Sequence, residues 1–168
     1  MGLVALQLFT LNTRWLVTPN FLDEPPERRA NFTAPDPQFA QRISFERQIA
    51  LVGYDLKLRQ TSEPSQGFVD LTLHWQALAQ PPHAYTVFTH VVDGEGRLVG
   101  QQDNMPLRDQ LPTSCWQPGE FIADPYRIAF TSGFSGPLSI EVGLYRLDTL
   151  ERLSLDDGSG TSARLSLP

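Results

Sequence analysis

The sequence has almost no lysine and almost no cysteine: Lys57 and Cys115 are each the only residue of their kind among 168. Charged residues make up 19% of the chain, and acidic residues outnumber basic ones to give a net charge of −6. This balance argues against nucleic acid as a partner, because binding phosphates needs clustered lysine and arginine side chains. A single cysteine excludes an internal disulfide and a metal site built from several thiolates. We expect the Cys115 thiol to be buried as a small apolar group.

Sequence motifs for catalysis are also missing. The chain contains no phosphate-binding loop, no dinucleotide-binding glycine pattern and no His-Glu-x-x-His zinc pattern. Helices are disfavoured too, because 14 prolines interrupt the chain and lysine, a good helix former, is nearly absent. We therefore predict a chain without helices that has no catalytic residues, no cofactor and no metal site of its own.

The first 44 residues differ in composition from the rest of the chain. Residues 1–22 form an apolar segment in which Arg14 is the only charge among the first 17. The apolar run is shorter than the roughly 20 residues that cross a bilayer, and it lacks the basic start of a secretory signal. Two interpretations stay open: the remnant of a membrane helix, or a strand of the domain that follows. Residues 23–44 are predicted to be a proline-rich linker, because such a stretch cannot bury a face.

Residues 45–168 show the period-two pattern of short β-strands. Apolar and polar residues alternate between residues 69 and 76, which is typical of a strand with one buried face. Residues 85–92 are apolar on both faces, so we expect a central strand that is covered on both sides. Further strands are expected near residues 49–54, 97–101, 126–130, 138–145, 152–155 and 163–167. The predicted fold is all-β, an antiparallel β-sandwich of seven to nine strands, immunoglobulin-like or jelly-roll-like.

Two histidines fall inside predicted strands. His74 and His90 could converge with Asp103, which closes the hairpin after His90, to form a metal site or an acid–base pair. The alternative is structural: His90 and Asp103 hydrogen-bond each other and tie the hairpin together. We favour the structural interpretation and keep His90 and Asp103 as candidate ligand-binding residues.

The loop of residues 104–119 and the strand after it carry further candidates for ligand binding. Trp116 lies in the loop, and Glu120 and Asp124 follow it. An acidic pair beside an aromatic ring is found in glycoside hydrolases, and also on sugar-binding surfaces, where an exposed ring stacks on the ligand. In the structural alternative, Trp116 closes the open end of the sandwich and the carboxylates belong to an ordinary loop.

Six stretches of sequence occur in an order that resembles a known family. They are residues 49–56 (IALVGYDL), 71–77 (LTLHWQA), 85–93 (YTVFTHVVD), 100–103 (GQQD), 112–120 (PTSCWQPGE) and 142–145 (VGLY). This succession is similar to the β-sandwich region at the C-terminus of large bacterial membrane glycosyltransferases. Those enzymes belong to the protein-mannosyltransferase-like group and take sugars from polyprenyl-phosphate carriers.

The resemblance implies a non-catalytic accessory domain at the extracytoplasmic face of a bacterial membrane, following the last membrane helix of such an enzyme. The catalytic residues of the transferase would lie in its membrane portion, so the resemblance carries none over to this chain. The partners that it implies are a glycan or the membrane portion of a glycosyltransferase. Two other hypotheses stay open: a small carbohydrate-active hydrolase, and a purely structural spacer domain.

Overall fold

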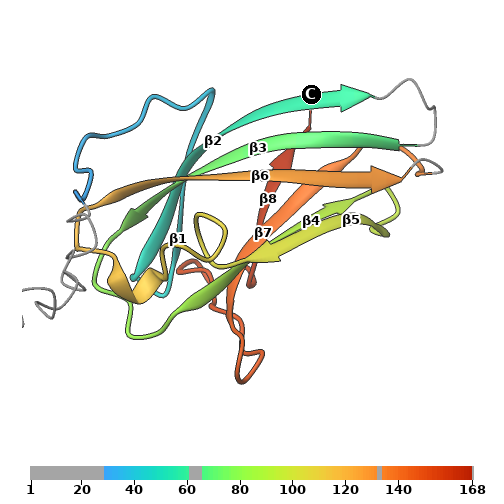
Figure 1. The fold of residues 1–168 in the computed structure, drawn as a ribbon. Helices are drawn as coiled ribbons and strands as arrows, with labels where there is room; N and C mark the ends of the chain where they lie inside the picture. The colour runs from blue at the N-terminus through green and yellow to red at the C-terminus, as the bar shows by residue number, and fades with distance from the viewer. Residues whose placement is uncertain (1–28, 61–65, 132–133, 168) are drawn as a thin grey trace, which may run out of the picture.

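The computed structural model describes residues 29–60, 66–131 and 134–167, which fold into two antiparallel β-sheets packed face to face (Figure 1). Sheet A has the strand order β1-β2-β3-β6, and sheet B has the order β5-β4-β7-β8. The strands are β1 (Phe39–Phe45), β2 (Ile49–Gln60), β3 (Gln66–Ala77), β4 (Tyr85–Val92), β5 (Leu98–Asn104), β6 (Phe121–Thr131), β7 (Ser139–Arg146) and β8 (Ala163–Ser166). The predicted all-β, antiparallel sandwich of seven to nine strands is confirmed.

Alternation of side chains along each strand places the core between the two sheets. The inward residues of β3 are Val69, Leu71, Leu73 and Trp75, each at most 1% exposed. Full burial of such a side chain contributes roughly 1.5–3 kcal/mol to folding. β6 alternates in the same way and lies at the edge of sheet A. An edge strand tolerates Pro125, because on an edge strand the missing N–H can be one that faces away from the sheet.

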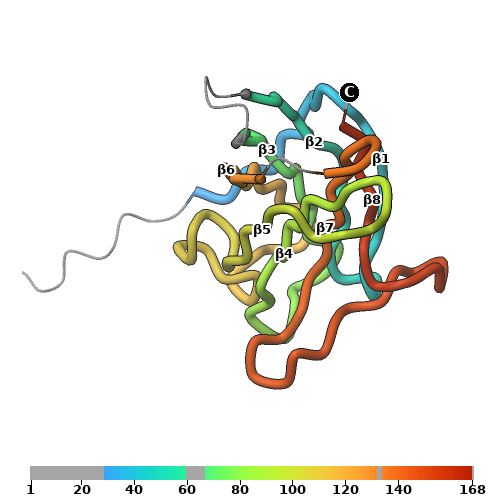
Figure 2. The backbone as a smooth tube through the Cα atoms, turned by 90° about the vertical axis from the view of Figure 1, so that its right-hand side faces the viewer, coloured from blue at the N-terminus to red at the C-terminus, as the bar shows by residue number. Residues whose placement is uncertain are grey.

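Strand β4 lies inside sheet B and is covered on both faces, as predicted. Val87 and Val91 face the core, whereas Phe88 faces the other way and is still only 1% exposed. The connection between β7 and β8 covers this outer face, because the Arg152 guanidinium lies 4.4 Å from the centroid of the Phe88 ring. Figure 2 shows this connection in orange and red towards the bottom of the molecule.

The two sheets also approach each other along their edges. On one side, a Cβ atom at Gly100 of β5 would lie 2.2 Å from the carbonyl oxygen of Ala129 in β6, so this close approach requires glycine. The Arg127 N–H of β6 donates to the Gln102 side chain of β5 across the same contact (3.0 Å). On the other side, the end of β1 forms an isolated bridge with Leu155.

The sandwich begins earlier than the sequence indicated. β1 starts at Phe39, inside the predicted linker of residues 23–44, and pairs with β2. Its alternation was obscured by the prolines just before it, whereas in the folded chain the Phe39 ring stacks on Tyr54 with 4.8 Å between centroids. The apolar segment of residues 1–22 lies outside the described residues. In the part of the chain that is described, no helix is long and apolar enough to cross a membrane.

Asp93 is a fully buried carboxylate that fixes the turn between β4 and β5. Its oxygens accept hydrogen bonds of 2.9–3.1 Å from the backbone of Glu95, Arg97 and Ser135 and from the Arg97 side chain. Burial opposes the charge, but these hydrogen bonds more than offset it and hold the pKa of Asp93 well below its ordinary value. The turn is thereby anchored to the connection between β6 and β7.

We predict that Asp93→Asn lowers the melting temperature by several degrees at pH 7, because the new amide replaces an acceptor with a donor that faces Arg97. Thermal unfolding followed by circular dichroism measures this change. Since the pKa of Asp93 is lowered from about 3.8, its contribution is present above pH 4 and is lost only as the pH falls further. The deficit should therefore be similar at pH 5 and pH 7.

The matched control is Glu95→Gln, which removes an exposed carboxylate 3.5 Å from the same guanidinium. This substitution should change the melting temperature little, because exposed ion pairs contribute about 0–1 kcal/mol. Equal melting temperatures for the two variants would contradict the anchoring role of Asp93.

Candidate functional site

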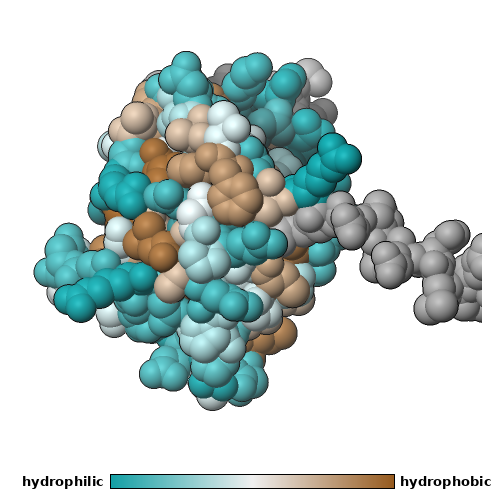
Figure 3. All heavy atoms as spheres, turned by 90° about the vertical axis from the view of Figure 1, so that its left-hand side faces the viewer, coloured by the Kyte–Doolittle hydropathy of each residue, from teal (hydrophilic) through white to brown (hydrophobic). Residues whose placement is uncertain are grey.

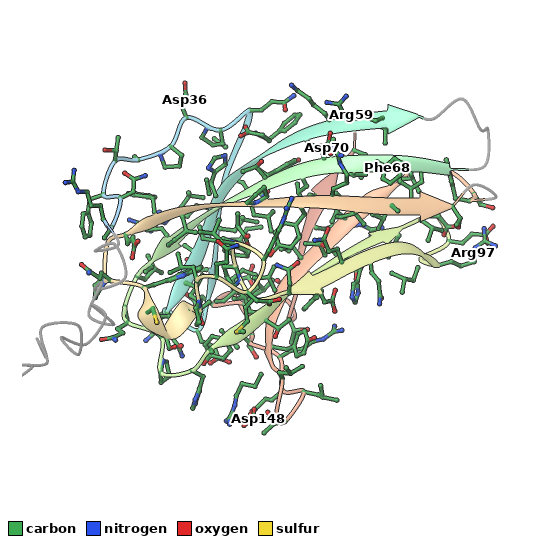
Figure 4. All side chains as sticks on the ribbon, viewed as in Figure 1. Asp36, Arg59, Phe68, Asp70, Arg97 and Asp148 are labelled. Atoms are coloured by element: carbon green, nitrogen blue, oxygen red, sulfur yellow. The ribbon has the colours of Figure 1, made fainter. Side chains whose placement is uncertain are left out.

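An open groove with a volume of about 740 Å³ lies on the outer face of sheet A. Strands β2, β3 and β6 contribute most of its lining, and the loop between β5 and β6 contributes Arg108. We call it the sheet A groove. Its charged lining residues are Asp55, Lys57, Arg59, Asp70, Arg108 and Arg127. Figure 4 shows Arg59, Asp70 and the neighbouring Phe68 on the upper side of sheet A, away from sheet B.

The register between β2, β3 and β6 brings the groove residues together on the outer face of sheet A. One row of directly opposed residues consists of Lys57, Asp70 and Arg127 on β2, β3 and β6. The next row on the same face consists of Asp55, Thr72 and Pro125. Residues two apart along a strand share a face, so long side chains stand beside short ones. Residues of both rows line the groove.

Asp70 holds two arginines together in the groove. Its Oδ1 accepts a hydrogen bond from Arg127 Nε (2.7 Å), and its Oδ2 accepts one from Arg59 Nε (2.5 Å). Both bonds lower the pKa of Asp70, and the bond from Arg127 has the larger effect. The arginine side chains are 61% and 63% exposed. Exposed ion pairs of this kind contribute little to stability.

Asp55 and His74 form a second polar pair on the outer face of sheet A. His74 Nε2 lies 2.8 Å from Asp55 Oδ2, and Asp55 Oδ1 accepts the Gln38 N–H at 2.6 Å. Both contacts lower the pKa of Asp55, and the hydrogen bond from Gln38 has the larger effect. The carboxylate is therefore held in its ionised form at the edge of the groove.

The convergence of His74 with His90 and Asp103, considered from the sequence, does not occur. His90 lies on β4 in sheet B, where its Nε2 is 3.5 Å from Asp103 Oδ1 on β5. This is the structural arrangement that we favoured, in which the pair joins the two strands of a hairpin. Both residues lie in sheet B, whereas the groove lies on sheet A. Within the described residues, no group of three or more His, Cys, Asp or Glu side chains could hold a metal ion.

Trp116 is fully buried, so the expectation of an exposed stacking ring is wrong. The structural alternative holds in this respect, because the ring belongs to the hydrophobic core. A short 3₁₀ turn, η2 (Thr113–Cys115), precedes it, and the Trp116 N–H donates to the Thr113 carbonyl (3.0 Å). Cys115, by contrast, is exposed rather than buried. A tight turn in the loop thus exposes Cys115, which we expected to be buried, and directs the ring of Trp116 into the core.

Glu120 and Asp124 do not flank a common cleft. Glu120 is 2% exposed, and its Oε2 accepts the Gln117 N–H at 2.9 Å, which orders the turn before β6. It also lines a smaller pocket of about 360 Å³ beside Leu107 and Leu111. Asp124 points into the interior between the two sheets and is fully buried. The paired arrangement expected for a glycoside hydrolase is therefore absent at these two residues.

Asp124 anchors the loop that brings Arg108 to the groove. Its Oδ1 accepts the Leu107 N–H (2.8 Å), and its Oδ2 accepts the Tyr126 hydroxyl (2.6 Å). Leu107, Arg108 and Asp109 have φ angles of 54°, 56° and 67°. The left-handed conformation costs L-residues roughly 1–2 kcal/mol each, so this turn needs interactions that stabilise it. The hydrogen bond to Asp124 is one of them.

Loss of hydration on burial has the largest effect on the pKa of Asp124. Burial raises its pKa to about 6, because the hydrogen bonds from Tyr126 and Leu107 only partly offset the lost hydration. Asp124 therefore differs from Asp93, which is equally buried but accepts more hydrogen bonds.

Comparison with known proteins yields no match: no protein-family model matches the chain, and neither a curated protein nor a solved structure is significantly similar to it. The resemblance to membrane glycosyltransferases therefore stays a prediction.

We predict that the protein becomes more stable as the pH falls from 7.5 to 5. The pKa of Asp124 is about 6 in the folded state against about 3.8 in an unfolded chain, so protonation over this range favours folding. Two pKa units correspond to about 3 kcal/mol at most. The measurement is the free energy of unfolding in urea at pH 5, 6 and 7.5 for wild type and Asp124→Asn.

The variant should lack most of this dependence, because an amide keeps the contacts to Leu107 and Tyr126 without a buried charge. The difference between the two proteins isolates Asp124 from the histidines, which are present in both. An identical pH dependence for the two proteins would show that the buried carboxylate is not its source.

We predict that Trp116→Ala lowers the free energy of unfolding by about 3–5 kcal/mol, because it leaves a large cavity in the core. Trp116→Phe should cost much less, since it also removes an indole N–H that has no partner among the described residues. Urea unfolding of both variants measures the difference. A loss below about 1 kcal/mol for Trp116→Ala would mean that the ring is exposed in solution.

Proposed function

We propose that this chain is a non-catalytic binding domain that holds a polar oligosaccharide in the sheet A groove. In this proposal it is the extracytoplasmic accessory part of a bacterial membrane glycosyltransferase. The transferase's own membrane portion, not this domain, would carry out sugar transfer. The observation that carries the proposal is the groove with its paired aspartates and arginines.

The size and the chemistry of the groove both suit a sugar. Its volume of about 740 Å³ lies within the roughly 300–1,000 Å³ of typical small-molecule sites. Sugar hydroxyls donate and accept hydrogen bonds at once, so they need donors and acceptors side by side. Asp70 between Arg59 and Arg127, with Asp55 and Thr72 in the next row, supplies that mixture.

The family resemblance supports the proposed location independently of the groove. Two of the stretches that carry it, residues 49–56 and 71–77, include the groove residues Asp55 and Thr72. An accessory domain outside the membrane would meet either the glycan acceptor or the product of the transferase. A glycan-binding surface on such a domain is consistent with both roles.

The two other hypotheses have less support. A hydrolase would need two carboxylates flanking the scissile bond, and Asp124 faces the core instead. A structural spacer agrees with the burial of Trp116 but leaves the charged groove without a role. A protein partner would favour a continuous apolar patch. The end of the molecule in Figure 3 is mostly hydrophilic with small separate apolar patches.

We predict that Asp70→Ala and Arg127→Ala each weaken glycan binding about tenfold or more, because each removes charge-assisted hydrogen bonds to the ligand. A glycan array identifies a binding oligosaccharide, and isothermal titration calorimetry then compares the variants. Both substitutions are on the surface, so the melting temperature should stay close to that of wild type.

The control is Arg164→Ala, which removes an exposed arginine from β8 on the opposite sheet. It should bind like wild type. Binding of no glycan by the wild-type protein would refute the proposal, and so would equal losses in all three variants.

A further inference from the structure

The sheet A groove has a charge opposite to that of the whole chain. Four cationic side chains and two carboxylates line it, which leaves a local excess of two positive charges. The whole chain has a net charge of −6. A positive groove on an acidic protein is not explained by overall composition, and it favours an anionic ligand at this one place.

The carboxylates of the groove already have partners. Asp70 accepts hydrogen bonds from Arg59 and Arg127 through its two oxygens. Asp55 is engaged by His74 and by the Gln38 backbone. These contacts are the closest that each acid makes, so neither acid forms a direct ion pair with the remaining cations of the groove.

Lys57 and Arg108 are the remaining cations. Both side chains line the groove, and among the described residues neither has a side-chain hydrogen bond or ion pair, although the charge of Lys57 helps to lower the pKa of Asp55. Lys57 lies directly opposite Asp70 in the sheet, yet the two arginines occupy the oxygens of that carboxylate. Lys57, the only lysine of the chain, therefore keeps its ammonium group exposed in the groove without a direct hydrogen bond to either carboxylate.

Lys57 and Arg108 belong to different walls of the groove. Lys57 is on β2, whereas Arg108 belongs to the loop between β5 and β6, at the β6 side. The backbone of Arg108 is fixed in a left-handed turn. The buried Asp124 carboxylate stabilises this turn by accepting a hydrogen bond from the Leu107 N–H. A ligand lying across β3 would meet one cation at each side.

We propose that the groove selects acidic saccharides, and that Lys57 and Arg108 bind the carboxylate or phosphoryl group of the sugar. The paired residues Asp70, Arg59 and Arg127 then contact the neutral hydroxyls. This inference rests on the proposed function, which requires only that a glycan binds in the groove. It adds the charge of the ligand and the two residues that recognise it.

The charge requirement is tested with pairs of ligands in which one member carries the acidic group and the other lacks its charge. Trigalacturonic acid is compared with its fully methyl-esterified form, which has the same rings and linkages without the carboxylates. Glucose 1-phosphate and glucose form the second pair and test the phosphoryl group. Calorimetry at low and at physiological salt measures affinity for wild type, Lys57→Gln, Arg108→Gln and the control Arg164→Gln.

We expect the acidic member of at least one pair to bind about tenfold more tightly than its neutral partner. Lys57→Gln and Arg108→Gln should each reduce that preference about tenfold, while Arg164→Gln retains it. The preference should weaken as salt rises, because exposed charges are screened. Which pair shows it distinguishes a carboxylate from a phosphoryl ligand.

Other results separate the two proposals. If a neutral glycan from the array binds in the groove but acid and neutral partners bind equally well, the charge selection is refuted and the binding function stands. If the preference survives in both groove variants, or is lost equally in Arg164→Gln, the assignment to Lys57 and Arg108 is refuted. If no saccharide binds wild type at all, the proposed function itself fails. Unchanged melting temperatures confirm that the variants are folded.

Discussion

A carboxylate buried between the two sheets holds one wall of the groove in place. Asp124 points inward because β6 alternates strictly, and it lies where an apolar residue would otherwise complete the core. An apolar side chain there would leave the Leu107 N–H and the Tyr126 hydroxyl without this acceptor. The loop that supplies Arg108 would then lose the contact that helps to stabilise its left-handed turn. The groove thus depends on a residue that never reaches its surface.

Three aspartates show how the number of donors sets the role of an acid in this fold. Asp93 is buried with several hydrogen bonds, and its pKa is lowered. Asp124 is buried with fewer, and its pKa is raised to about 6. Asp70 is near the surface, where arginines keep it ionised. Solvation lost on burial must be replaced by hydrogen bonds, so the first acid stabilises a turn, the second is costly, and the third stays ionised near the surface.

The sequence predicted the fold better than it predicted the site. Period-two alternation identified the one-sided strand β3 and the doubly covered strand β4, because burial of each face acts directly on residue type. The sequence left both an exposed and a buried ring open for Trp116, because it does not show that the turn before this residue directs the ring inward. The groove was missed because Lys57, Asp70 and Arg127 are far apart in the chain and each resembles an ordinary solvated residue. The sequence did indicate that these three charged side chains point outward from their strands. Without the strand order, it did not show that the three strands are neighbours.

By itself, the sequence determined that this chain forms an antiparallel sandwich, because the alternation of apolar residues is a local property that each strand carries alone. It also determined the absence of a disulfide, since one cysteine cannot pair within the chain. The tertiary structure decided which charges meet, through the order β2-β3-β6 and the register that aligns Lys57, Asp70 and Arg127. It also decided that Trp116 packs into the core and that Asp124 accepts a hydrogen bond from the loop between β5 and β6. Those outcomes depend on contacts between distant segments, and such contacts exist only once the sheets have formed.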